Sequence, residues 1–367
     1  MAARHCARSD TVARRGGDEF CVVAPCSGPA EADALVARIE GAWEEMLELG
    51  ATTLRVDRSI GVALFPAHGD EVEVLLRRAD IAMYSAKAHN LVSVRYESGW
   101  DEHHQRQLAL VADLREAIDG DQLTLEYQPQ IDLATGSVGH VEALLRWDHP
   151  ELGRISPAEF IPLAENAGYV RSLTRWVVGQ VVRQCGAWQA DGTDLQVAVN
   201  ISALDLLDDS LPAHVAQVLE HHAVPPERIT LEITESAVMQ DAAHAMQVLR
   251  ALRDTGVRLS IDDFGTGESS LAQLRRLPVD ELKIDKSFIL DLHESDADDS
   301  IEAIVRSTIE LGHNMGLSVV AEGVETPYAR EWLLRYGCDL AQGFLFSKPL
   351  APAALEQWVT RFRAQGT

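Results

Sequence analysis

The sequence lacks several features that would fix its location outside the cytoplasm. It has no run of about 18 or more apolar residues, so no membrane span is expected in this chain. The basic opening MAARHCARSD is not followed by an apolar segment, so no secretion signal is predicted. The five cysteines are scattered and form no Cys-x-x-Cys pair. Such cysteines favour reduced thiols and a cytoplasmic location over disulfides or a thiolate metal site.

Positive charge is also in short supply. The 367 residues include 32 Lys and Arg against 57 Asp and Glu, which gives a net charge of −25. A field of that sign repels long polyanions, and no basic stripe is visible, so DNA is not expected as a partner. A small anionic ligand is still compatible with this charge if metal ions neutralise its site.

The first hundred residues have the pattern of a small α/β module. Gly16 and Gly17 separate two strand-like segments and predict a β-hairpin. The next elements are a helix near 30–48, a strand at 59–65, a helix at about 71–88 and a strand at 91–96. An amphipathic segment at 105–119 predicts a connecting helix. We therefore expect a module at 1–98, a linker helix at 99–120 and a second domain at 121–367.

From residue 121 onward, short apolar strands alternate with helices. Strands are predicted at 123–130, 138–147, 195–200, 229–234, 258–263, 281–284, 318–321 and 339–342. Helices between them are predicted at 169–190, 241–255, 298–315 and 326–336, among others. The short ATGS turn makes the first two strands an antiparallel pair, whereas the later alternation favours parallel strands. This pattern predicts a (β/α)8 TIM-like barrel with one antiparallel strand, with a doubly wound open sheet as the alternative.

Polar residues collect where these strands end. One acid after a strand is usually a helix cap or a solvated loop residue. Carboxylates that gather at one barrel mouth repel one another unless cations neutralise them, and oxygen ligands without His or Cys point to Mg²⁺ or Mn²⁺. Incidental acids on a barrel are the alternative reading. The strand-end residues are Glu142, Arg146, Asn200, Glu232, Glu235, Asp262, Asp263, Lys283, Asp285, Glu322, Glu325 and Gln342.

Residues 121–367 resemble a whole EAL domain, the family of cyclic di-GMP phosphodiesterases. The signature Glu142-Ala143-Leu144 stands within EALLRW, and NIS, ExxE, DDFGTG, KID, AEGVE and QGF follow in the family's order. The resemblance implies hydrolysis of cyclic di-GMP to linear pGpG in bacterial signalling. It also implies two Mg²⁺ or Mn²⁺ ions per site, inhibition by Ca²⁺ and a homodimer formed through the EAL domain.

The resemblance also implies a role for each site residue. The first metal would be bound by Glu142, Asn200, Glu232 and Asp262, and the second by Asp263 and Glu322 with Asp262 as a bridge. Lys283, Glu322 and Glu142 would serve catalysis, with Lys283 positioning or activating the attacking water. Substrate would be bound by Arg146, Gln342 and Leu145, and Glu235 would support the DDFGTG loop. One departure lies in that loop, where Glu268 replaces an aromatic residue that is usual in the family, so retuned turnover is expected.

The N-terminal module resembles a GGDEF (diguanylate cyclase-like) domain. Residues 16–20 spell GGDEF, and SIGVALFP and ADIAMYSAK follow at suitable distances. The fifteen residues before Gly16 are too few for the strand and helices that precede this hairpin in the family, so we expect no cyclase activity and exposed apolar faces. Two other functions remain open for the whole chain: a non-catalytic cyclic di-GMP receptor acting through a protein partner, and an interaction scaffold that binds no nucleotide.

Overall fold

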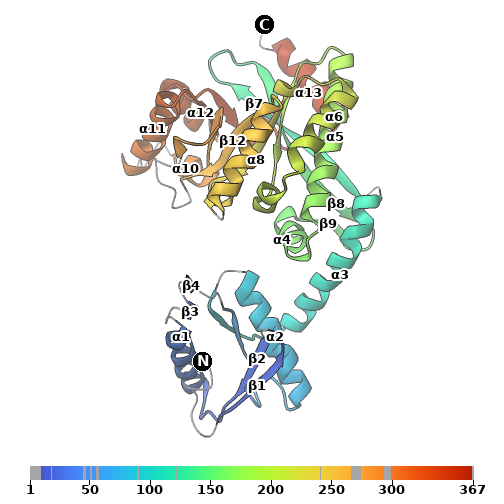
Figure 1. Cartoon of the computed structure of the whole chain (residues 1–367). Helices are drawn as coiled ribbons and strands as arrows, with labels where there is room; N and C mark the ends of the chain where they lie inside the picture. Colours follow the sequence, from blue (N-terminus) through green and yellow to red (C-terminus); the bar gives the residue numbers. More distant parts are fainter. Residues whose placement is uncertain are drawn as a thin grey trace. The chain divides into compact units, whose positions relative to one another are not determined.

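The computed structural model in Figure 1 describes residues 10–17, 19–43, 47–49, 52–54, 58–88, 91–120, 122–239, 241–265, 274–292 and 299–365. Glu268 lies outside these described residues. The chain divides into two compact units, Met1–Leu110 and Val111–Thr367, and each is described by itself. The division falls inside helix α3 (Trp100–Asp119), the segment expected to connect the domains. The boundaries 1–98, 99–120 and 121–367 remain predictions.

The described part of the first unit contains short strand pairs, two whole helices and the first part of α3. Its strands pair as three separate two-stranded sheets, of which the last is parallel and the others antiparallel. The elements are β1 (Thr11–Gly16), β2 (Glu19–Val23), α1 (Pro29–Trp43), β3 (Leu47–Leu49), β4 (Thr52–Leu54), β5 (Ile60–Val62), α2 (Val72–Ala88) and β6 (Ser93–Arg95).

The predicted glycine hairpin is confirmed, since β1 and β2 pair across Gly16 and Gly17. The helix predicted at 30–48 is described only to Trp43, and its predicted end overlaps the unforeseen strand β3. A close approach explains one glycine here: a Cβ on Gly61 would lie 1.9 Å from the carbonyl oxygen of Ala79, so β5 can pack on α2 only with glycine there.

Large apolar side chains of the first unit are exposed, as expected of an incomplete module. Phe20, Val23, Phe65 and Val72 are all more than half exposed. The buried apolar cluster of the described residues in this unit is small, with Ile81, Ala82 and Tyr96 at its centre. The burial that stabilises larger domains is therefore limited in this unit.

In the second unit, eight strands close into a barrel. β7 (Leu123–Asp132) pairs antiparallel with both of its neighbours, β8 (Val138–His149) and β15 (Leu340–Gln342). The remaining strands run parallel, and β8 also pairs with β10, which closes the ring and excludes the open sheet. They are β10 (Gln196–Asn200), β11 (Ile229–Thr234), β12 (Arg258–Phe264), β13 (Glu281–Ile284) and β14 (Ser318–Ala321), and β9 (Gly153–Ile155) extends the sheet beside β8.

Helices surround these strands (Figure 1). The four helices predicted between strands are confirmed to within one or two residues at each end. The helices of the described barrel unit, apart from α3, are α4 (Pro157–Ala167), α5 (Val170–Ala190), α6 (Leu211–His222), α7 (Glu235–Met239), α8 (Ala242–Asp254), α10 (Lys286–Leu290), α11 (Asp299–Asn314), α12 (Pro327–Arg335), α13 (Pro352–Gln365) and the 3₁₀ turns η2 (Ala203–Leu207) and η3 (Pro226–Arg228).

Alternation along each strand separates the core from the site. In β11, Ile229, Leu231 and Ile233 are fully buried in the apolar core. The residues between them, Thr230 and Glu232, point to the opposite face, into the barrel, because side chains alternate along a strand. The apolar outer layer therefore holds the fold together while the inner layer is free to carry polar chemistry. No helix among the described residues has the length and apolar character needed to cross a membrane.

Candidate functional site

Lys283 lies at the centre of a buried acidic cluster. Its side chain is fully buried in β13, and its Nζ lies 2.6 Å from Glu322 Oε1, 2.9 Å from Glu232 Oε2 and 3.2 Å from Asp262 Oδ1. Glu142 Oε1 lies further away, at 4.0 Å. These residues meet because their strands are parallel, which brings the carboxyl ends to one mouth of the barrel.

Amide side chains fix the carboxylate of Glu142. Asn200 Nδ2 donates to one of its oxygens at 2.7 Å, and Gln342 Nε2 donates to the other at 2.6 Å. Gln342 is itself held by β7, since it donates to Gln128 Oε1 at 3.0 Å and accepts from Gln130 Nε2 at 2.9 Å. The antiparallel strand β7 thus positions Gln342 and, through it, the carboxylate of Glu142.

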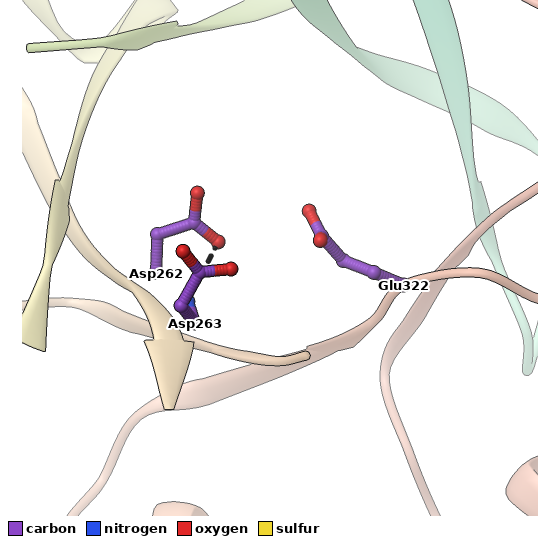
Figure 2. Close-up of side chains that lie close together, drawn as sticks. All are labelled: Asp262, Asp263 and Glu322. Carbon is purple, nitrogen blue, oxygen red and sulfur yellow. Dashed lines mark hydrogen bonds between the residues drawn. The ribbon is translucent and has the colours of Figure 1, made fainter. Parts of the chain in front are cut away.

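A backbone turn brings two neighbouring aspartates to the same site. Asp263 has a φ of +54°, one of two non-glycine residues with positive φ in the described chain. Its N–H donates to Asp262 Oδ1 at 2.9 Å, and the register with β13 shifts between Ile261 and Phe264. Adjacent residues of a regular strand point to opposite faces, whereas here both carboxylates face Glu322 across the barrel mouth (Figure 2).

The electrostatics of this cluster favour added positive charge. Burial raises the pKa of Glu232 well above its usual value, and neighbouring carboxylates raise it further against the opposing effect of Lys283. Burial likewise raises the pKa of Glu322 to about 7. The pKa of Asp263 is raised to about 6, first by burial and then by the charges of Asp262 and Asp285. One ammonium group therefore does not compensate the carboxylates around it.

The residues present fit divalent cations. Asp262, Asp263 and Glu322 each offer an oxygen, and these atoms lie within 4.8 Å of one another. Glu232 is fully buried; its Oε2 forms an ion pair with Lys283 at 2.9 Å, whereas its Oε1 accepts no hydrogen bond from another described residue. A buried carboxylate oxygen without a donor is costly unless a further cation approaches it. Oxygen ligands without His or Cys suit Mg²⁺ or Mn²⁺.

Arg146 has different partners from the acidic cluster. Its Nε donates to Glu126 Oε2 at 2.7 Å, and its Nη1 donates to the carbonyl of Leu145 at 3.0 Å. Glu126 also accepts from Arg154 Nη1 at 2.6 Å, so two guanidinium groups share one carboxylate. Burial acts to raise the pKa of Glu126, but the hydrogen bonds from Arg154 and Arg146 outweigh this effect and lower the pKa. The strand-end sequence did not indicate this network.

Glu235 contacts the loop that follows β12. It begins helix α7, and its Oε2 accepts a hydrogen bond from the backbone N–H of Gly265 at 3.3 Å. Gly265 lies two residues after Asp263 and next to the undescribed part of the DDFGTG segment. The contact agrees with the loop-supporting role that we expect for Glu235, which remains a prediction.

A comparison with known protein families finds a family that agrees with the chemistry of this site. The model of the family named EAL domain matches residues 111–349. The chain belongs to the EAL domain family. The model named diguanylate cyclase, GGDEF domain, matches residues 2–91, so the EAL domain is preceded by a partial GGDEF domain.

Two relatives from Pseudomonas aeruginosa cover nearly the whole chain. The chain is 42% identical over 343 residues to the bifunctional diguanylate cyclase/cyclic di-GMP phosphodiesterase MucR, spanning 93% of this chain and 50% of MucR. It is 41% identical over 357 residues to the cyclic di-GMP phosphodiesterase NbdA, spanning 97% of this chain and 45% of NbdA. The chain therefore spans about half the length of these relatives.

A solved structure titled as the PaMucR phosphodiesterase in complex with c-di-GMP resembles the EAL domain. The TM-score is 0.63 and the sequence identity is 44%, over 67% of this chain and 99% of that chain. The predicted (β/α)8 barrel with one antiparallel strand is confirmed by the closed barrel and by this likeness. The roles assigned to single residues remain predictions.

The EAL barrel brings most of the predicted site residues into one linked cluster. Arg146 and Leu145 lie further along β8 than Glu142 and outside this cluster. Glu235 contacts the backbone of the loop that follows β12. The cluster contains Glu142, Asn200, Glu232, Asp262, Asp263, Lys283, Glu322 and Gln342.

Sequence reasoning missed three polar residues of β7. Glu126, Gln128 and Gln130 are spaced by two, so they share one face of the strand and point toward the site residues. A polar residue at every second position of an otherwise apolar strand was the available signal. The predicted site residues all come from strand ends, whereas these three lie within the strand.

Proposed function

We propose that this EAL domain hydrolyses cyclic di-GMP to linear pGpG with two divalent cations. The observation that carries the proposal is the buried set of carboxylates around Lys283, which meets on neighbouring strand ends and holds more negative charge than the lysine neutralises. The family and the printed names of the two relatives support the same reaction.

The metal ligands are proposed as two sets that share Asp262. Glu142, Asn200 and Glu232 would complete the first set, and Asp263 and Glu322 the second. When bound, such a pair of cations lowers the pKa of a water molecule and neutralises charge on the phosphate oxygens. Mg²⁺ and Mn²⁺ would support turnover, whereas Ca²⁺ would occupy the site without supporting it.

The chain's own residues would orient the substrate and move the proton. Arg146 is held on its Nε side by Glu126, which leaves Nη2 for a phosphate oxygen of the ligand. Leu145 and Gln342 would complete the pocket wall. Lys283 would position the attacking water and offset phosphate charge, and Glu322 would accept the water's proton. The water oxygen bonds to phosphorus, the P–O3′ bond breaks, and O3′ takes a proton from solvent and leaves as a hydroxyl, which gives one linear dinucleotide.

A turnover assay tests this function. Full-length protein is incubated with cyclic di-GMP and Mg²⁺, and pGpG is measured by chromatography. We expect turnover in the wild type and none in Glu142→Ala or Asp262→Ala, both folded by circular dichroism. A folded, Mg²⁺-saturated wild type without turnover would contradict the proposal. Binding of cyclic di-GMP without cleavage would instead identify a non-catalytic receptor.

Assembly and location are proposed on other grounds. A homodimer formed through the EAL domain is expected from the family resemblance, and sedimentation at several protein concentrations would test it. A cytoplasmic location is expected from the scattered cysteines, two of which, Cys185 and Cys338, are buried free thiols.

A further inference from the structure

A polar cavity outside the acidic cluster lies on the barrel, with a volume of about 550 Å³. Its lining combines three arginines with one aspartate and an apolar wall. The residues that define it are Arg253, Arg258, Arg275, Asp280, Met315 and Ser318. Leu277 and Leu317 add to the apolar wall. A cavity of this size can hold a ligand as large as a nucleotide.

This cavity lies at the opposite end of the barrel from the acidic cluster. Arg258 is the first residue of β12 and Ser318 is the first of β14, while Asp280 directly precedes β13. The same strands carry Asp262 and Lys283 toward their carboxyl ends. Because the three strands are parallel neighbours, their starts and their ends lie at different mouths.

The arginines carry positive charge that the cavity does not balance. Arg253 Nη2 lies 3.3 Å from Asp280 Oδ1, which is long for a charge-assisted hydrogen bond. Asp280 is already engaged, since its other oxygen accepts from the N–H of Leu259 at 3.1 Å. Among the described residues, the hydrogen-bond partner of Arg258 Nη2 is the hydroxyl of Ser318, at 3.5 Å. Arg275 is exposed and has no hydrogen bond or ion pair to another residue that the structure describes.

Glu281, the residue after Asp280, is a buried acid that could compensate this charge. It is almost fully buried at the start of β13, and burial raises its pKa above the usual value, although Lys283 and Arg258 oppose this. Its Oε2 lies 3.5 Å from Ser318 Oγ. Three guanidinium groups therefore line one cavity with a single carboxylate, that of Asp280, while Glu281 lies outside the lining. This local excess of positive charge occurs on a chain whose net charge is −25.

We propose that this cavity binds a phosphate-bearing small molecule, with its phosphate between Arg253, Arg258 and Arg275. Planar guanidinium groups pair with phosphate oxygens in a bidentate manner, which suits them to this anion. The apolar wall formed by Leu277, Met315 and Leu317 would contact the organic part of the ligand. The limited volume of the cavity favours a small molecule over an extended polyanion, which the net charge of the chain repels.

Calorimetric titration with inorganic pyrophosphate tests the site on the full chain in EDTA. We expect saturable binding of one pyrophosphate per chain, weakened about tenfold in Arg275→Ala because one charge-assisted contact is lost. Arg275 is exposed, so its removal should leave the fold intact. Arg276→Ala is the matched control, because Arg276 is the next exposed residue but does not line the cavity.

Arg146→Ala separates this site from the proposed phosphodiesterase site. Pyrophosphate affinity should be unchanged in this variant if the ion binds among the three arginines. Loss of binding in Arg146→Ala, no saturable binding in the wild type, or equal affinity in wild type and Arg275→Ala would each overturn the proposal. The measurement uses no metal and no cyclic di-GMP, so its failure is distinguishable from failure of the proposed hydrolysis.

Discussion

Lys283 is both a proposed catalytic group and the internal counter-charge of the barrel. Its ammonium lies within 3.2 Å of oxygens from Glu232, Asp262 and Glu322, and no part of its side chain is exposed. These carboxylates raise the pKa of Lys283 well above its usual value against the opposing effect of burial. The lysine is therefore charged in the folded protein. In the absence of metal, its charge stabilises the surrounding carboxylates.

Lys283→Met should abolish hydrolysis and destabilise the metal-free protein. Removing one partner of a buried ion pair costs about 3–5 kcal/mol, because the remaining charges are left uncompensated. Mg²⁺ should restore part of the lost free energy of unfolding in the variant, as measured by urea unfolding with EDTA and with Mg²⁺. Lys286→Met is the control, since Lys286 is exposed and should show neither effect. An unfolding free energy equal to that of the wild type in EDTA would argue against this charge balance.

Glu126 is a residue whose role emerges only from its contacts. Its carboxylate fixes Arg146 from the Nε side and also accepts from Arg154. A side chain held in place before binding loses less conformational entropy when the ligand arrives. Glu126 is thus a positioning residue for the phosphate contact that we propose for Arg146.

Glu126→Ala should raise KM and leave kcat within about twofold. Immobilising one long side chain costs about 0.5–1.5 kcal/mol, so KM should rise by about two- to thirteenfold. Steady-state kinetics with cyclic di-GMP measure both constants. Arg154→Ala removes the second partner of Glu126 but keeps its contact with Arg146, and should behave like the wild type. A fall in kcat with unchanged KM would instead place Glu126 in the chemical step.

At the scale of elements, the turn η2 shows how a buried acid adjusts stability beside the site. It follows β10, whose last residue is Asn200, and its Asp205 is buried. Both Thr174 Oγ1 and the N–H of Ser202 donate to Asp205 Oδ2, at 2.7 and 2.8 Å. Burial nevertheless raises the pKa of Asp205 to about 6, against the effect of these hydrogen bonds.

Asp205 should make the protein less stable as the pH rises from about 4 to 6. Its folded-state pKa lies above the unfolded value, so the folded state binds more protons in this window and the free energy of unfolding falls with pH. Asp205→Asn keeps one oxygen for both donors and carries no charge. Relative to the wild type, this variant should gain about 1.5 kcal/mol between about pH 5 and pH 7.5 in urea unfolding. Parallel pH profiles would contradict the prediction.

At the scale of the whole molecule, the acidic cluster belongs entirely to the second unit. Each of its residues lies within Val111–Thr367, and so does the arginine-lined cavity. The first unit has exposed apolar side chains and small separate strand pairs. All residues proposed for hydrolysis of cyclic di-GMP therefore come from the barrel unit.

Glu19→Ala in the GGDEF hairpin should leave cyclic di-GMP hydrolysis within about twofold of the wild type. Glu19 is exposed on β2 of the first unit, and no ligand of the proposed metal sites comes from that unit. The same result is expected for Asp18→Ala. Initial rates at saturating Mg²⁺ measure the effect. A change of tenfold or more would mean that the hairpin takes part in the phosphodiesterase reaction.

Much of the barrel could be predicted because its signals are local. Apolar strands such as ITLEIT and helices between them follow from hydrophobic spacing, and the short turn before Val138 forces the first pair to be antiparallel. The strand-end acids were also visible, since the parallel order brings such ends together. The hairpin of β3 and β4 is not predicted because its strands are short, and the helix predicted at 30–48 overlaps the start of β3.

Which residues reach the barrel mouth follows from strand order and alternation, and both can be predicted from the amino-acid sequence. The turn of Asp263 to the same side as Asp262 is visible in the folded chain alone, since it requires a positive φ and a shifted register. The positions of Lys283 among the carboxylates and of Glu126 beside Arg146 are likewise visible only in the tertiary structure. Distances between side chains on different strands depend on how the sheet closes, and no local pattern along the chain encodes that closure.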